Sequence, residues 1–425
     1  MNLNKNDNLG FWSSASLVVG NMIGSGIFLL PASLALYGLV SILGWLFASI
    51  GAILLAIVFG ELSKIYNKEP GGPYKFTRNV FGEFPAFLVA WGYWISIWST
   101  NTAIVVAFLG YLSVFIPSLN TYPLYSIIIG LFTIWTLTWI NSKEIKTIGF
   151  VQKITVVLKV IPIILVGIIG IFFIDLNNFY SLEIGNEFNF NSITVTTTLT
   201  FFAFLGMESA TIPSDKINSP NSIIKKATLY GTIFTIIIYI LSSISIMGII
   251  PPTTLAQSSA PFADAAEVIA GDYSRKVIAL GAIIATIGAL NGWILIQGQI
   301  PMAASKDKLF PKFFSKTNNN KSPVFGIILS SLLISILLLF SYSKTLVEAF
   351  TFMIKLSTLS VITPYLFSTA SLAVLSKRKF NRLFISFLAF IFSIWIIIGC
   401  GIETIKLGMI MLIAGIPFYF WFKRK

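Results

Sequence analysis

The sequence predicts an all-α integral membrane protein with about twelve membrane-spanning helices. Hydrophobic residues make up 56% of the 425 residues and charged residues only 11%, whereas soluble domains carry roughly 25% charged residues. The apolar residues are gathered in runs long enough to cross a bilayer, which takes about 20 mostly apolar residues in a helix. Basic residues concentrate in every second connection between these runs. These three observations place residues 1–425 in lipid, as a single polytopic domain.

Twelve apolar runs of spanning length follow one another along the chain. The segment before the first run is short and polar, without the basic-then-apolar layout of a cleaved signal peptide, so we expect the first helix to be retained. The third run is long enough to require a tilted helix. The runs cover residues 11–36, 39–62, 84–115, 122–140, 148–174, 192–212, 227–250, 276–300, 323–341, 346–374, 383–400 and 402–422.

The distribution of charge predicts the orientation of the chain. The tails and the even-numbered connections hold most of the 29 Lys and Arg residues, whereas the connection at 175–187 has three acidic residues and no basic one. By the positive-inside rule, both termini are cytoplasmic and the number of spans is even. We therefore attribute the net charge of +13 to membrane topology, and we expect a lipid bilayer, not a nucleic acid, as the macromolecular surroundings in the cell inner membrane.

The residue inventory argues against an enzyme. The chain has no histidine and a single cysteine, Cys400, so His-based metal sites and His general bases are excluded. An intramembrane enzyme needs a polar catalytic cluster, such as paired aspartates on facing helices, and the spans offer none. We expect no catalytic residue, no metal and no cofactor.

Two spans are interrupted at mid-depth by helix-poor residues. The first contains Gly20 and the Gly-Ser-Gly run at residues 24–26, and the sixth contains Gly206 followed closely by Glu208. The two spans lie five apart, an odd offset, so a repeat relating them would be inverted in the membrane, as in many secondary transporters. The alternative for the first span is close helix packing through a pair of small residues four apart.

An unwound segment in a bilayer has a specific use. Unpaired backbone is tolerated at that depth only where it is buried in protein or lines a cavity. If the first span unwinds near Ser25, the amide groups that follow form the positive end of a half-helix and can hold a carboxylate.

Two ionisable residues lie deep inside apolar runs. Burying a charge such as Glu208 at mid-membrane costs roughly 2.5–3.5 kcal/mol on insertion scales, so such residues usually face a cavity or a partner. The alternative is a structural, hydrogen-bonded acid. Lys159, near the middle of the fifth span, can substitute for a bound sodium ion or release a proton, unless the helix is shifted so that this lysine reaches the membrane interface. Lys355 in the tenth span is a similar but weaker case, because Glu348 lies two turns away.

Three motifs together resemble a known family. They are residues 24–28 (GSGIF), 70–74 (PGGPY) and 204–209 (FLGMES), in this order and at these separations. The ordered set is similar to the amino acid-polyamine-organocation transporters, most of all to bacterial arginine/agmatine antiporters, and the likeness extends over nearly the whole chain. It implies a leucine-transporter-type fold, with inverted five-helix repeats at about 11–174 and 192–374, two further helices at about 383–422, and a homodimer.

The resemblance also implies roles for individual residues. Ser25 and Gly26 would bind the substrate carboxylate, and carbonyls near Met22 and Ala203 would take the α-amino group. A gate on the cytoplasmic side would consist of Tyr93, Glu208 and Tyr365. The implied substrate-binding residues are Met22, Ser25, Gly26, Asn101, Phe202, Ala203, Leu205, Trp293 and Ser357.

The sequence departs from the antiporters at positions that bear on the cargo. Phe202 stands where they carry a tryptophan over the substrate, Ile104 where they carry a methionine, and Asn291 where they carry a glycine. Lys159 is similar to a lysine of proton-coupled permeases in the same superfamily. The cargo, an amino acid or its decarboxylated amine, therefore stays open.

We accordingly expect a secondary transporter that works by alternating access. Exchange of an amino acid against a related amine is the preferred mode, and proton-coupled uptake with Lys159 as the titrating group is the alternative. A channel has no reason to carry two interrupted spans five apart, and an intramembrane enzyme lacks its catalytic cluster.

Overall fold

The computed structural model describes residues 10–24, 26–66, 71–143, 148–180, 189–212, 214, 217, 220–319, 322–341, 343–376 and 379–423. Over these residues the chain is helical and has no β-strand. Ten of the described helical segments are long and apolar enough to cross a membrane, and two shorter apolar helices cover residues 159–173 and Val324–Phe340. The predicted all-α, multi-pass membrane fold is confirmed, and the count of twelve spans stays a prediction.

The helices coincide with the apolar runs of the sequence. Short helices occupy the connections: α4 (Pro73–Phe81), α6 (Ser118–Thr121), α9 (Asn177–Tyr180), α12 (Pro252–Leu255) and α13 (Pro261–Ala270). The longer helices are α1 (Phe11–Met22), α2 (Gly26–Leu34), α3 (Val40–Ile65), α5 (Glu83–Leu112), α7 (Pro123–Lys143), α8 (Ile148–Gly170), α10 (Phe190–Phe201), α11 (Pro220–Ile249), α14 (Asp272–Lys306), α15 (Val324–Phe340), α16 (Leu346–Leu375), α17 (Phe380–Gly399) and α18 (Ile402–Lys423).

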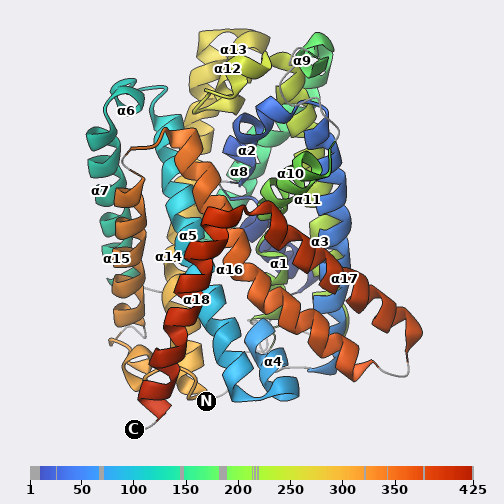
Figure 1. The fold of residues 1–425 in the computed structure, drawn as a ribbon. Helices are drawn as coiled ribbons and strands as arrows, with labels where there is room; N and C mark the ends of the chain where they lie inside the picture. Colours follow the sequence, from blue (N-terminus) through green and yellow to red (C-terminus); the bar gives the residue numbers. More distant parts are fainter. Residues whose placement is uncertain are drawn as a thin grey trace.

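The helices divide into a buried centre and a lipid-facing rim. The most apolar window of α5 is 89% buried, against 33% for α7 and α17 and 17% for α18. At the rim, large apolar side chains such as Phe132 and Ile410 are 72% and 65% exposed, as expected where the solvent is hydrocarbon. In the centre, α5 packs against α16 and α14, and α3 packs against α11 and α10. Figure 1 shows α5 and α16 in the middle of the bundle, with α7 and α15 along one edge.

The two ends of the bundle differ in charge. At one end, which we call the basic face, Glu61 on α3 pairs with Lys225 and Arg382, and Asp307 after α14 pairs with Lys75 and Arg78. In Figure 1 this end carries α4 and the end of α18. The opposite end, which we call the vestibule face, carries α6, α9, α12 and α13.

Candidate functional site

The first interruption separates α1 from α2. Helix α1 ends at Met22, Ile23 leaves the helical conformation (φ −75°, ψ 83°), and α2 begins at Gly26. The amide of Gly24 donates to the Met22 carbonyl at 2.8 Å. The predicted interruption is therefore present, although Gly20 belongs to α1 and does not take part in it. Ser25, predicted to bind a carboxylate, lies outside the described residues.

The second interruption follows α10. A 3₁₀ turn covers Phe202–Phe204, Leu205 is extended, and a second 3₁₀ segment covers Met207–Thr211. Between them Gly206 has φ +100°, a left-handed conformation that costs a residue with a Cβ roughly 1–2 kcal/mol. The glycine therefore allows the reversal of direction that breaks this span.

The two interruptions lie against each other. A Cβ built on Gly26 would lie 3.2 Å from the Cα of Ala203, and one on Gly206 would lie 3.1 Å from the carbonyl carbon and the Cβ of Asn21. Each broken span thus meets the other through a residue without a side chain. Glycine at positions 26 and 206 permits backbone groups from both spans to face the same space.

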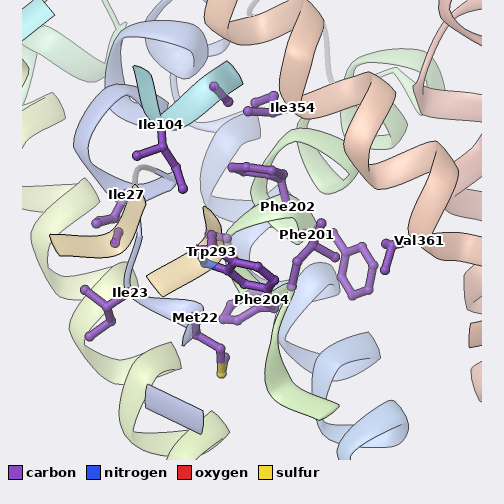
Figure 2. Close-up of a cluster of buried hydrophobic side chains, with 14 of the residues drawn as sticks. Met22, Ile23, Ile27, Ile104, Phe201, Phe202, Phe204, Trp293, Ile354 and Val361 are labelled. Carbon is purple, nitrogen blue, oxygen red and sulfur yellow. The ribbon is translucent and has the colours of Figure 1, made fainter. Parts of the chain in front are cut away.

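That space is a small cavity of about 20 Å³. Such a volume holds about one water molecule, so the site is contracted in this structure. Figure 2 shows Trp293, Phe202 and Ile104 within the apolar cluster around it. The lining residues are Asn21, Met22, Gly24, Gly26, Tyr93, Ser96, Ile97, Thr100, Ile104, Phe202, Ala203, Leu205, Gly206, Glu208, Trp293 and Val361.

One face of α5 forms a wall of the cavity. Its lining residues Tyr93, Ser96, Ile97, Thr100 and Ile104 recur at intervals of three or four, which places them on one side of a helix. The helix starts at the basic face, where its first residue pairs with Lys423. Tyr93 therefore lies toward the basic face and Ile104 toward the vestibule face.

Glu208 joins two tyrosines from different helices. Its carboxylate is fully buried, with one oxygen accepting a hydrogen bond from Tyr93 at 2.7 Å and the other from Tyr365 at 2.8 Å. The structure thus brings together the three residues predicted to form a gate. They link α5, the second interruption and α16 on the basic-face side of the cavity.

Two predicted substrate contacts are engaged elsewhere. The Asn101 amide nitrogen donates to Gln297 at 2.6 Å. The Ser357 hydroxyl is 2.6 Å from that of Thr100 and donates to the Ser96 carbonyl at 3.0 Å. Asn101 and Ser357 therefore lie behind the cavity wall in this contracted state.

Lys159 approaches the first broken span and does not line the cavity. Its side chain is only 3% exposed, and its ammonium donates to the Gly20 carbonyl at 3.4 Å. The Lys159 side chain is therefore enclosed by protein. Its ammonium lies one turn before the α1 interruption.

Some residues of the site were not predicted. Tyr239 on α11 donates to the Met22 carbonyl at 2.7 Å, so the oxygen proposed for an α-amino group already has a partner. Ser96 and Thr100 line the cavity beside Tyr93, and their spacing from that tyrosine was a usable signal. Gln297, an amide within the apolar run at 276–300, was a second. No cluster of metal-ligating side chains occurs in the part of the chain that the structure describes.

Comparisons with known proteins agree over nearly the whole chain. A family model described as amino acid permease matches residues 9–420. The chain is 31% identical to the putrescine transporter PotE of Haemophilus influenzae, over 98% of this chain and 97% of that protein. It is 31% identical to an arginine/agmatine antiporter of Chlamydia felis (97% and 89%), and 28% identical to an arginine/ornithine antiporter of Pseudomonas aeruginosa (94% and 88%).

Proposed function

The chain belongs to the amino acid permease family, and from this premise we propose that it is a secondary transporter exchanging an amino acid for a related amine across the cell inner membrane. The observation that carries the proposal is the pair of interrupted spans, which meet at Gly26 and Gly206 around a buried cavity. The antiporters and the putrescine transporter among its relatives support this cargo class.

The proposal includes a specific membrane arrangement. Twelve spans would form two inverted five-helix repeats of the leucine-transporter type, with α17 and α18 as additions and a homodimer as the assembly. The interruptions in the first and sixth spans support the repeats, because corresponding broken helices at a midplane site are the mark of such transporters. The basic face, which carries Glu61 and Asp307 with their cations, would be cytoplasmic by the positive-inside rule.

In the proposed binding mode, the broken spans hold the polar head of the cargo. The amides at the start of α2, near Ser25 and Gly26, would bind its carboxylate, since a helix N-terminus favours an anion. Carbonyls near Met22 and Ala203 would receive an α-amino group, with Leu205 beside them. For Met22 this requires its oxygen to accept a second hydrogen bond besides that from Tyr239.

The remainder of the cargo would lie between aromatic rings. Trp293 and Phe202 both line the cavity, and an aromatic face attracts a cationic group by about 0.5–2 kcal/mol. Asn101 and Ser357 would contact the cargo only when the cavity expands and their bonds to Gln297 and Thr100 exchange. Binding would therefore be coupled to rearrangement of the wall.

Glu208 would close the route from this site to the cytoplasm. Its two tyrosine partners come from α5 and α16, so releasing either hydrogen bond separates two helices on the basic-face side of the cavity. The arrangement supports an alternating-access cycle in which this gate is shut in the present structure.

Exchange is tested by counterflow in proteoliposomes. Purified protein would be reconstituted and external labelled arginine, ornithine, putrescine and neutral amino acids supplied one at a time. We expect uptake of at least one to rise several-fold when the same or a related compound is inside. Absence of saturable uptake across the panel would reject a transporter, and uptake independent of internal cargo would reject exchange.

Proton-coupled uptake is the second candidate, favoured by the contact between the Lys159 ammonium and the broken span at Gly20. It predicts that an inward proton gradient drives accumulation in the absence of internal cargo, and that Lys159→Gln abolishes this drive. Lys143→Gln, at the exposed end of α7, is the matched control. If Lys159→Gln keeps both counterflow and pH profile unchanged, Lys159 has no coupling role.

A further inference from the structure

A second cavity, far larger than the first, lies at the vestibule face. Its volume is about 1190 Å³, against about 20 Å³ between the broken spans. The end of α2, helix α6, helix α12 and the residues after it, the first turns of α16 and the connection from α17 to α18 all contribute to its lining. We call this cavity the vestibule. The vestibule is large enough for a hydrated amino acid without any rearrangement of the protein. The inner cavity is too small for one.

The charged groups of the vestibule are unevenly placed. Glu348 and Glu403 are exposed, and the Glu348 carboxylate accepts a hydrogen bond from the Thr345 amide in the first turn of α16. Lys355 is partly buried, seven residues further along α16, a rise of about 10 Å. Among the described residues, its ammonium has no hydrogen-bond or ion-pair partner. The acids therefore mark the outer rim, and an unpaired cation lies deeper.

Lys355 is also close to the site between the broken spans. Ile354, its neighbour on α16, belongs to the apolar cluster around that site (Figure 2), and Ser357 follows two residues later behind the cavity wall. One turn before Lys355, the Thr351 hydroxyl shares a hydrogen bond of 2.8 Å with the hydroxyl of Ser33 on α2. Along α16, Lys355 thus lies between Glu348 at the rim of the vestibule and Ser357 behind the wall of the inner cavity.

We infer that Lys355 makes the vestibule a binding site for the carboxylate of the cargo. This inference rests on the proposed function and narrows it: the compound taken from the vestibule face carries a free carboxylate, and an amine without one is disfavoured there. An unpaired, partly desolvated ammonium attracts a carboxylate and repels the two ammonium groups of a diamine. The same repulsion favours release of an amine product into the vestibule, so one side chain would give the exchange its direction.

The test compares two compounds on charge variants of Lys355. Protein in right-side-out proteoliposomes, preloaded with unlabelled cargo, would take up an external amino acid found to be transported, with putrescine as the amine. For Lys355→Gln and the similarly sized Lys355→Met, we expect the apparent KM for the amino acid to rise about tenfold, the size expected for a lost charge-assisted hydrogen bond. The apparent KM for putrescine should fall or stay unchanged. Lys355→Arg should keep the wild-type preference.

Lys344→Gln is the matched control. Lys344 lies at the same end of the bundle but is exposed and lines a separate, smaller cavity, so its removal should leave the ratio of the two KM values unchanged. If Lys355→Gln and Lys355→Met keep the wild-type ratio of the KM for the amino acid to the KM for putrescine, the inference is overturned. Failure of wild-type protein to exchange at all would instead reject the proposed function.

Discussion

The two ends of the bundle handle charge in opposite ways. At the basic face, the buried carboxylate of Glu61 receives Lys225 and Arg382, each at 2.6 Å, and Asp307 receives Lys75 and the hydroxyl of Tyr74, each at 3.1 Å. Burial raises the pKa of Tyr74, next to Asp307, so its hydroxyl stays protonated and able to donate up to strongly alkaline pH. At the vestibule face a cavity of about 1190 Å³ is lined by Lys355, whose ammonium has no hydrogen-bond or ion-pair partner in the part of the chain that the structure describes.

This difference identifies the state of the protein. The paired residues tie α3 to α11 and α17, and α4 to the end of α14, so charge pairs close the basic face. At the vestibule face, Arg275 pairs with Asp264 and Glu267 and joins α13 to α14, and the vestibule stays hollow. In an alternating-access cycle, the pairs at the basic face would break when the vestibule closes. The ion pairs that stabilise the state closed at the basic face would then oppose the change to the state open at that face.

The largest expected effect comes from Glu208, which closes the cavity on its basic-face side. Glu208→Ala leaves the buried hydroxyls of Tyr93 and Tyr365 without an acceptor, and each such loss costs roughly 1–3 kcal/mol. We expect the rate of exchange in proteoliposomes to fall at least about tenfold. A thermal unfolding measurement should show that the variant protein is still folded. Asp272→Ala, which removes an exposed acid that pairs with Lys276 outside the vestibule, is the control. Wild-type exchange by Glu208→Ala would remove Glu208 from the gate.

A smaller effect is expected from Glu61. Breaking a fully buried ion pair costs about 3–5 kcal/mol, but Lys225 and Arg382 are 34% and 28% exposed, so we expect about 1–2 kcal/mol for Glu61→Ala. The loss should shift the protein toward a state open at the basic face. The vestibule would be probed by labelling Thr351→Cys with a membrane-impermeant thiol reagent, in a Cys400→Ser background.

In Glu61→Ala, labelling at position 351 should slow, because the vestibule closes as the basic face opens. Glu83→Ala is the control, since Glu83 is 41% exposed and pairs with Arg78 at 3.2 Å, a surface arrangement worth about 0–1 kcal/mol. Equal labelling rates in Glu61→Ala and wild type would show that this ion cluster does not hold the state.

The smallest expected effect is at the vestibule face itself. Ser33 on α2 and Thr351 on α16 share one hydrogen bond of 2.8 Å, and losing such a bond costs about 0.5–1.5 kcal/mol. Ser33→Ala should therefore change the apparent KM for external cargo by at most a few-fold. Ser315→Ala, in the connection after α14 where the hydroxyl is exposed, is the control. A larger effect of Ser33→Ala would reverse the comparison between the two faces.

Much of this arrangement follows from local sequence. Gly206 and Glu208 predict the second interruption, because neither residue fits the centre of an apolar helix. Gly26 predicts the first. The partners of buried polar and charged residues do not follow from local sequence. Asn101 meets Gln297 at a sequence separation of 196 and Glu61 meets Lys225 at one of 164, and only packing of the helices sets such pairs. The prediction that Gly20 takes part in the first interruption was wrong, because a glycine inside a helix and one at its end look alike in sequence.

The contracted cavity has a consequence for the cell. A pore conducts through a continuous file of water or ions, whereas the space between the broken spans holds about one water molecule. The middle of the protein therefore acts as an insulating plug when no cargo is bound. A carrier built this way can remain in the membrane in large numbers without short-circuiting the gradients on which other transporters depend.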